Sequence, residues 1–223
     1  MKPLLALVGI CLLSVACGSS SSTTAPSTTP QANRPPSITS ANVTPASGVT
    51  TLSTHSFTAS ATDPDGDAVT YKWDFGNGTT SNNASASVMF NNASTTTYQA
   101  TLTATDSRGA SSSTTVSITS VSMTGTWAGT LVTPITAVMT QYLGGIVTGT
   151  WQQPARSAQG EIGPAGEPGT IQASGQFELR FKVRVGSFTD FYYRGTVDPT
   201  GQRLTGTLQG SGFAGNTLVL TKQ

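Results

Sequence analysis

Apolar and polar residues alternate along most of the chain after residue 34. The alternation is clearest in SFTASATD (56–63), AVTYKWDF (68–75), TYQATLTATD (97–106) and TTVSITSV (114–121). A period of two residues puts every second side chain on the same face of a β-strand, so each segment offers one face to a core. None of these segments shows the 3.6-residue period of an amphipathic helix. The pattern therefore predicts an all-β fold.

The chain after residue 121 contains eight further strand-like segments separated by turn residues. Eight short antiparallel strands within about 100 residues are typical of a small up-and-down β-barrel. The Gly/Pro-rich segment 152–169 is predicted to be a long loop rather than a strand. The predicted strands are 124–132, 135–142, 146–151, 170–175, 177–185, 188–197, 203–210 and 216–222.

The first 34 residues differ in composition from the rest. An apolar run from Leu4 to Val15 follows Lys2, and it is long enough for a signal peptide but too short to span a bilayer. Small residues before Cys17 resemble the lipobox of bacterial lipoproteins, which implies that residues 1–16 are removed and that Cys17 is lipidated. The alternative is an ordinary cleaved signal, because Ser14 stands where the lipobox most commonly has leucine.

The expected location follows from this N-terminus. Residues 17–34 contain no large apolar side chain, so we expect a disordered Ser/Thr/Pro tether between the membrane and the folded part. Lipidation at Cys17 implies attachment to the bacterial cell envelope, at the outer membrane or cell surface. Without Lys2 the chain has ten basic and ten acidic residues, so no basic field favours a nucleic-acid partner.

Residues 35–121 carry two short signatures. WDFGNGTTS (73–81) and YQATLTATDSRGASS (98–112) closely resemble the signatures of the PKD domain, an immunoglobulin-like β-sandwich. Asn77 departs from the family pattern, which usually has aspartate there. Trp73 lies on the apolar face of its segment, so we expect it to anchor the core between two sheets.

An acidic stretch precedes the first signature. Asp63, Asp65 and Asp67 lie between two predicted strands, and the expected sandwich topology brings Asn33 and Asp106 to the same pole. Hard oxygen ligands from loops suit a structural Ca²⁺ ion, although the spacing is not that of an EF-hand. A solvated turn is the alternative, because aspartate, proline and glycine all favour turns. No other cofactor is expected.

The predicted barrel, residues 122–223, resembles lipocalin and avidin barrels in one feature. Gly125-Thr126-Trp127 stands on its first strand and Lys222 on its last. Trp127 and Trp151 are expected to be structural, and the resemblance carries no biotin site, because Gly129 replaces a polar ligand residue. A Gly-Thr pair recurs at 125, 149, 195 and 206, and we expect these glycines to ease strand curvature.

Candidate ligand-binding residues lie in the same domain. Arg180, Lys182 and Arg184 share the polar face of one predicted strand and are either an ordinary solvated face or a cationic strip for an anionic glycan. Tyr192 and Tyr193 either stack on sugars or pack at the barrel rim.

The sequence favours a binding protein over an enzyme. The single histidine, His55, has no recognisable catalytic context, and neither a G-x-S-x-G nor an H-E-x-x-H motif is present. We therefore expect a non-catalytic, lipid-anchored envelope protein whose β domains bind a surface protein or carbohydrate. The alternative is a lipocalin-like carrier that holds a small ligand inside the barrel. A filled interior would favour recognition on the outer surface.

Overall fold

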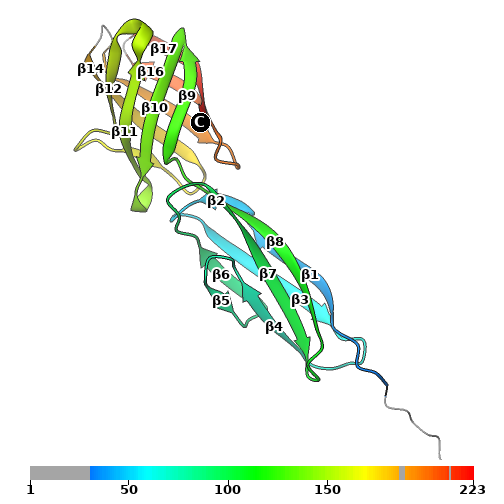
Figure 1. Ribbon diagram of the computed structural model, residues 1–223. Helices are drawn as coiled ribbons and strands as arrows, with labels where there is room; N and C mark the ends of the chain where they lie inside the picture. The colour runs from blue at the N-terminus through cyan, green and yellow to red at the C-terminus, as the bar shows by residue number, and fades with distance from the viewer. Residues whose placement is uncertain (1–30, 186–188, 211) are drawn as a thin grey trace, which may run out of the picture. The chain divides into compact units, whose positions relative to one another are not determined.

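The computed structural model describes residues 31–185, 189–210 and 212–223, which form a β-sandwich and a β-barrel (Figure 1). The signal peptide, Cys17 and most of the tether expected from the sequence lie outside the described residues. No helix in the described part of the chain has the length and apolar character needed to cross a bilayer.

The sandwich consists of two sheets, as the alternating segments predicted. One sheet has the strand order β1-β3-β6, and the other has the order β2-β8-β7-β4-β5. All pairings are antiparallel except that of β2 with β8. The strands are β1 (Ser37–Thr44), β2 (Ser47–Val49), β3 (Thr54–Thr62), β4 (Val69–Asp74), β5 (Thr80–Ser81), β6 (Ser85–Met89), β7 (Thr96–Asp106) and β8 (Ser111–Val121).

Trp73 occupies the centre of the sandwich core. Its side chain is fully buried, and its ring meets that of Phe57 edge to face at 5.3 Å and stacks on that of Phe75 at 6.2 Å. Trp73 therefore packs in the core between the two sheets. His55 is also buried and forms a hydrogen bond of 2.6 Å through Nδ1 with the carbonyl oxygen of Pro45, so it serves the packing of this domain.

The second half of the chain is a closed antiparallel barrel. Its ring runs β9-β17-β16-β15-β14-β12-β11-β10 and closes through the pairing of β10 with β9, while the short β13 pairs with β11 and β14 beside it. The strands are β9 (Gly125–Leu131), β10 (Thr133–Gln141), β11 (Ile146–Gln153), β12 (Ala158–Ile162), β13 (Gly169–Ile171), β14 (Gln176–Val185), β15 (Phe191–Val197), β16 (Arg203–Gly210) and β17 (Phe213–Lys222). Two 3₁₀ turns, η1 (Leu143–Gly145) and η2 (Pro154–Arg156), flank β11.

One strand of the ring differs from the sequence prediction. Strand β12 lies within the segment predicted to be a loop, whereas the predicted strand 170–175 contributes only to β13. The inward positions of β12 are Ala158, Gly160 and Ile162, and two of these are too small to give an evident apolar alternation. Gly160 is also required by packing, since an added Cβ would lie 1.8 Å from the Lys182 carbonyl oxygen.

Large side chains fill the barrel interior. Tyr193 and most of the large aromatic residues are at most 3% exposed, and leucines from β14, β16 and β17 complete the core. Trp127 and Trp151 both belong to this core. The largest interior side chains are Trp127, Trp151, Phe177, Phe181, Phe191 and Tyr193.

The repeated glycines act mainly through close backbone approach. Gly195 and Gly206 lie opposite each other on β15 and β16, and a Cβ on Gly195 would lie 2.5 Å from the Gly206 Cα. A Cβ on Gly149 would lie 2.0 Å from the Val138 carbonyl oxygen. These strands pass too close to their neighbours for any side chain at these positions.

Trp127 and Lys222 come together as their resemblance to lipocalin barrels implied. The Lys222 Nζ lies 5.2 Å from the centre of the Trp127 ring and donates a 3.1 Å hydrogen bond to the Ser122 carbonyl oxygen. The Trp127 indole donates to the Met123 carbonyl oxygen at 2.8 Å. Burial lowers the pKa of Lys222. Lys222 and Trp127 therefore form a cation–π interaction.

Candidate functional site

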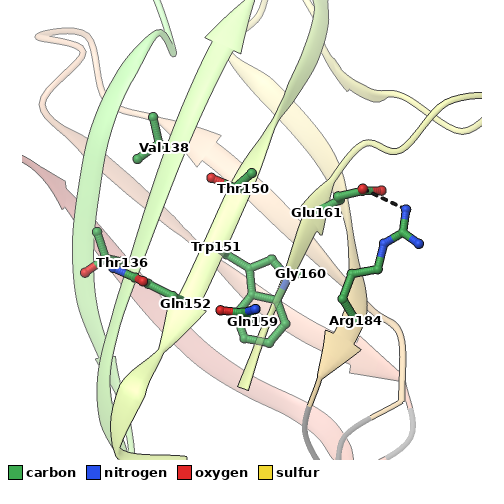
Figure 2. A pocket seen from close by; sticks show the side chains of 9 residues that line it. All are labelled: Thr136, Val138, Thr150, Trp151, Gln152, Gln159, Gly160, Glu161 and Arg184. Carbon is green, nitrogen blue, oxygen red and sulfur yellow. Dashed lines mark hydrogen bonds and ion pairs between the residues drawn. The ribbon is translucent and has the colours of Figure 1, made fainter. Parts of the chain in front are cut away.

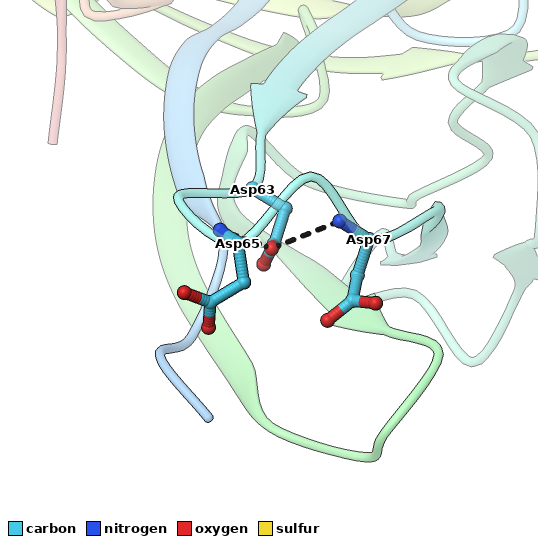
Figure 3. A group of neighbouring side chains, drawn as sticks. All are labelled: Asp63, Asp65 and Asp67. Atoms are coloured by element: carbon cyan, nitrogen blue, oxygen red, sulfur yellow. Dashed lines mark hydrogen bonds between the residues drawn. The ribbon is translucent and has the colours of Figure 1, made fainter. Parts of the chain in front are cut away.

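Two clusters of polar side chains are candidate sites: the acidic pole of the sandwich and the outer face of the barrel. The acidic pole comprises Asn33, Arg34, the loop between β3 and β4, and the start of the β7–β8 turn. The three carboxylates of the β3–β4 loop lie together in Figure 3, with ligand atoms of Asp63, Asp65 and Asp67 all within 4.8 Å of one another. The loop has this shape because the Asp63 Oδ1 accepts backbone N–H groups from Asp65 at 2.8 Å and Asp67 at 3.1 Å.

Arginines neutralise two of these carboxylates. The Asp65 carboxylate accepts the backbone N–H of Arg34 and its Nε–H, each at 2.8 Å. The Arg34 backbone hydrogen bond, followed by the Arg34 side-chain bond, lowers the pKa of Asp65. The Asp67 carboxylate pairs with Arg108, whose Nε and Nη2 lie 2.8 Å and 2.7 Å from Oδ2. This hydrogen bond to Asp67 raises the pKa of Arg108.

Asp106 and Asn33 meet at the same pole, as the sequence predicted. The Asn33 Nδ2 donates to Asp106 Oδ2 at 2.9 Å, and Asp106 Oδ1 accepts the backbone N–H groups of Arg108 and Ala110, each at 2.9 Å. Burial acts to raise the pKa of Asp106, but the bonds from Asn33 and from the backbone outweigh it, so the pKa is lowered. Asp106 therefore orders the β7–β8 turn and fixes residue 33.

The donor set fits calcium only in part. Asn33 Oδ1 and Asp63 Oδ2 are buried oxygen atoms without a hydrogen-bond partner among the described residues, and oxygen is the ligand that calcium requires. The other carboxylate oxygens named here already accept hydrogen bonds from arginines, Asn33 or the backbone. A cation would have to displace Arg34 and Arg108 to gain the charge of Asp65 and Asp67. The arginine pairs therefore favour the turn over a calcium site in the wild-type loop, and calcium binding stays a prediction of the sequence alone.

The second candidate site is a groove on the outer face of the barrel, which we call the β10–β12 groove. It has a volume of about 430 Å³. Cross-strand pairing builds it in two rows: Thr136–Gln152–Gln159, and Val138–Thr150–Glu161. Figure 2 shows these side chains across β10, β11 and β12. The lining residues are Thr136, Val138, Thr150, Trp151, Gln152, Gln159, Gly160, Glu161 and Arg184.

A β-bulge places the charged end of this groove. Gln159 pairs with Val185 and Gly160 pairs with Val183, so Arg184 is the additional residue on β14. A bulge redirects the side chain of the extra residue. The Arg184 guanidinium reaches Glu161 on β12, with a distance of 2.7 Å between Nη2 and Oε1 (Figure 2).

Trp151 forms the floor of the groove from within the barrel. Gly160 carries no side chain, so the indole lies close beneath β12, and its Nε1 donates to the Lys182 carbonyl oxygen at 3.3 Å. The ring is only 3% exposed and packs against Phe181 and Phe191 at 5.9 Å and 5.6 Å. The groove therefore combines hydroxyl, amide and charged groups with the half-exposed Val138 above an aromatic core, and it provides no exposed aromatic platform.

Two further hollows adjoin the groove. The loop hollow, of about 690 Å³, lies between the segment 163–168 and the outer face of β11, β12 and β14, and it shares Thr150, Glu161 and Arg184 with the groove. The tyrosine hollow, of about 220 Å³, is lined by Glu167, Pro168, Thr170, Glu178, Arg180 and Tyr192. The loop hollow and the tyrosine hollow share Pro168, so the three hollows follow one another across the barrel surface.

The cationic row predicted on β14 lies on the outer face but is largely neutralised. Arg180 forms ion pairs with Glu167 and with Asp190, the latter at 2.9 Å, and Arg184 pairs with Glu161. Lys182 lines the loop hollow and forms no ion pair within the described part of the chain. A continuous cationic strip is therefore a wrong description of this face.

The two candidate tyrosines lie on opposite sides of β15. Tyr193 is fully buried and donates its hydroxyl to the Leu218 carbonyl oxygen at 2.9 Å, so its predicted role as a ligand-binding residue is wrong, and it packs in the core rather than at the rim. Burial strongly raises its pKa. Tyr192 is partly exposed beside the Arg194 guanidinium, whose carbon lies 5.1 Å from the ring centre. Only Tyr192 belongs to the outer site.

The residues that form most of the groove were not predicted as a site. Thr136, Thr150, Gln152 and Gln159 occupy outward positions of their strands, which is the only signal of their role in the sequence. Their convergence depends on β12, which lies in the segment that the sequence pattern predicts to be a loop.

Comparisons with known proteins agree with the sandwich half of the chain. Residues 33–121 match the family model of the PKD domain, and this segment is a PKD domain. The crystal structure of the PKD1 domain of Vibrio anguillarum Epp is 29% identical, with 40% of this chain and 96% of that chain covered and a TM-score of 0.31. A structure of carbohydrate-binding modules from the β-sandwich superfamily, described for their promiscuous specificity, is 20% identical, with 86% of each chain covered and a TM-score of 0.37. No curated protein matches this chain significantly.

Proposed function

We propose that this protein is a non-catalytic, lipid-anchored binding protein of the bacterial cell envelope, whose barrel recognises carbohydrate through the β10–β12 groove. The observation that carries the proposal is the contrast between the two sides of the barrel wall. The interior is filled by buried aromatic and leucine side chains, whereas the outer face has a groove of about 430 Å³ whose lining includes threonine, glutamine and charged side chains. A ligand would therefore bind outside.

The chemistry of the groove favours sugar hydroxyls. Threonine hydroxyls and glutamine amides can each donate and accept hydrogen bonds, as a sugar hydroxyl does. Thr136, Thr150, Gln152 and Gln159 present these groups on three adjacent strands. The Glu161–Arg184 pair adds a charged acceptor and a charged donor, which make stronger hydrogen bonds than neutral groups.

The alternative of a lipocalin-like carrier has less support. Such a carrier needs a cavity of a few hundred Å³ with convergent polar groups inside the barrel. In the described residues Trp127, Tyr193 and Phe181 are fully buried in that space, and the Tyr193 hydroxyl is already bonded to Leu218.

The N-terminus supplies the anchoring part of the proposal. Cys17 resembles the lipidated cysteine of bacterial lipoproteins, and the polar segment after it would hold the PKD domain and barrel away from the membrane. Metabolic labelling with a fatty-acid probe tests this part, and Cys17→Ser should abolish incorporation. A wild-type protein that stays unlabelled would contradict lipid anchoring without affecting the groove.

A glycan array with the purified full-length protein tests the binding part. The double substitution Gln152→Ala and Gln159→Ala should weaken binding about tenfold or more, because it removes two bidentate hydrogen-bonding groups from exposed positions. Gln202→Ala is the matched control, since Gln202 is an exposed glutamine in the β15–β16 turn outside the groove lining. A wild-type protein that binds no glycan, or a double variant that binds normally, would refute the proposal.

A further inference from the structure

Most of the exposed apolar side chains in the described part of the chain lie on one hairpin of the barrel. Of the six large hydrophobic residues that are exposed there, four belong to the β10–β11 hairpin: Val138, Tyr142, Leu143 and Ile146. Tyr142 is 54% exposed and is the aromatic residue among the six. Single apolar residues scattered over a surface need no explanation, but a group of them on one hairpin indicates a contact surface.

These residues extend the outer side of the β10–β12 groove. Alternation continues past the end of β10, because Tyr142 keeps an extended backbone with φ −105° and ψ 173°. Its N–H bonds to the Ile146 carbonyl oxygen at 2.7 Å, which closes the tip of the hairpin. Val138 and Thr150 face each other across β10 and β11 inside the groove (Figure 2). We call the outward row from the groove to the tip the hairpin face; it consists of Val138, Thr150, Thr140, Thr148, Tyr142 and Ile146.

The hairpin face carries no charge. Residues 109–155, which include β9, β10 and β11, contain no aspartate, glutamate, lysine, arginine or histidine. The charged pair of the groove, Glu161 with Arg184, belongs to β12 and β14 on its other side. A neutral ligand can therefore cover the hairpin face without removing water from an ionised group, which would oppose binding.

The order of side chains on the hairpin face favours a carbohydrate chain over a protein surface. The centre of a protein interface is a contiguous apolar patch within a polar rim. Here Thr140 and Thr148 separate Val138 from the apolar residues at the tip. A sugar ring has C–H groups on its faces and hydroxyl groups around its rim, so it fits apolar side chains that alternate with hydroxyl groups. Tyr142 combines an apolar ring with a hydroxyl at its edge.

Building on the proposed carbohydrate-binding function, we infer that the ligand is a neutral polysaccharide that lies along the hairpin face, from the β10–β12 groove to the tip, where Tyr142 stacks on a sugar ring. The groove binds hydroxyl groups of the units at its own end, and it lacks an exposed aromatic ring. Tyr142 supplies that ring four residues beyond Val138, about 13 Å along the strand. A short oligosaccharide in the groove does not reach it.

Isothermal titration of the full-length protein with cello-, manno- and xylo-oligosaccharides of two to six units tests the inference. At least one series should bind about tenfold more tightly as the hexasaccharide than as the disaccharide, because only the longer chain spans the groove and Tyr142. Tyr142→Ala should remove most of that gain and leave disaccharide binding unchanged, whereas Tyr142→Phe should keep the gain. An increase in salt from about 0.05 M to about 0.5 M should change the affinity less than about twofold, since a neutral ligand has no charge to be screened.

Met89→Ala is the matched control. Met89 is another of the six exposed apolar residues, and it lies at the end of β6 in the sandwich. Its substitution should leave the affinity for the hexasaccharide unchanged. The melting temperature of Tyr142→Ala should stay within about 2 °C of the wild-type value, because the ring is exposed and the backbone bond to Ile146 remains.

The outcomes separate this inference from the proposed function. A hexasaccharide affinity that survives Tyr142→Ala, or an equal loss for disaccharide and hexasaccharide, overturns the role of the hairpin face. Strong salt dependence overturns the neutral ligand. Self-association that light scattering detects in the wild type but not in Tyr142→Ala, with unchanged glycan affinity, also overturns the inference, because the hairpin face would then bind protein.

A different pattern would leave the groove in place. If the neutral oligosaccharides do not bind, but another glycan on the array binds and the Gln152→Ala and Gln159→Ala double variant loses it, the inference fails and the proposed function stands. Absence of binding to every glycan overturns both.

Discussion

Tyr192 and Tyr193 are adjacent residues with opposite environments, so a pair of matched substitutions tests the direction of β15. The Tyr193 ring is fully buried against Phe177, with 4.9 Å between ring centres, and its hydroxyl bonds to Leu218. The Tyr192 ring lies at the outer face in the tyrosine hollow. Tyr193→Ala should destabilise the barrel, whereas Tyr192→Ala should leave it nearly unchanged.

The magnitudes follow from burial. Removing a fully buried aromatic ring costs about 3–5 kcal/mol, because the transfer free energy is lost and a cavity remains. For a domain of about 100 residues, this corresponds to a fall of about 15–30 °C in the melting temperature of the barrel. Tyr193→Phe keeps the ring and loses one hydrogen bond, so it should cost about 1 kcal/mol. A surface change such as Tyr192→Ala should remain within about 0.5 kcal/mol.

Thermal and urea unfolding of the full-length variants, followed by near-UV circular dichroism, measures these differences. A pH series adds a second test, because burial raises the pKa of Tyr193 above its value of 10.0 in the unfolded chain. The folded state then keeps a proton that the unfolded state releases, so this contribution to stability is complete below pH 10 and declines as the pH rises above it. Tyr193→Phe should lack this alkaline decline.

Equal destabilisation of the protein by Tyr192→Ala and Tyr193→Ala would contradict the assigned direction of β15. A loss of glycan binding in Tyr193→Ala without a change in the unfolding free energy would also contradict it, because that result would place Tyr193 on the outer face. Either finding would require a different register for β15.

Three further predictions concern other parts of the chain. Gly149→Ala should lower barrel stability by about 2 kcal/mol or more in urea unfolding, because its Cβ would lie 2.0 Å from the Val138 carbonyl oxygen; unchanged stability would contradict the close strand approach. Millimolar calcium should leave the wild-type melting temperature within about 1 °C of its value in EDTA. In Arg108→Gln, calcium should raise the melting temperature, because Asp67 then lacks its cation. A large calcium-dependent increase in the wild-type melting temperature would show that calcium displaces the arginine. Asp106→Asn should weaken the loss of stability in acid. The pKa of Asp106 is lowered in the folded state, so the stability that its carboxylate contributes is present above the ordinary pKa of 3.8 and is lost as the pH falls through the folded-state pKa. An unchanged acid unfolding profile in Asp106→Asn would count against this contribution.

The sandwich was predictable because its information is local and strong. Alternation in the segments 56–63 and 97–106 fixes which face is buried, and Trp73 is the largest apolar residue on such a face. The convergence of Asn33 and Asp106 was also predictable, because antiparallel strands return the chain to the same pole. The ion pairs at that pole, of Arg34 with Asp65 and of Arg108 with Asp67, were not predicted.

The barrel was predictable as a class but not in its functional detail. Strand β12 carries two small inward residues, and the absence of large side chains hid it from a hydrophobic pattern. Without β12, Gln159 and Glu161 belong to a loop, and the groove has no third strand. The bulge at Arg184 leaves no mark on the alternation, because it is defined by pairing with a strand more than twenty residues away.

The sequence by itself determined that this chain forms all-β domains, which residues of most strands face a core, and that the second domain has a polar row on β14. These properties follow from side-chain period and size, which each segment carries alone. Only the tertiary structure decided which polar residues meet. Pairing between strands closed the ring and filled its interior. The same pairing brought carboxylates to Arg180 and Arg184 and left Lys182 facing a hollow. Each of these results depends on distances between residues that are remote in the chain.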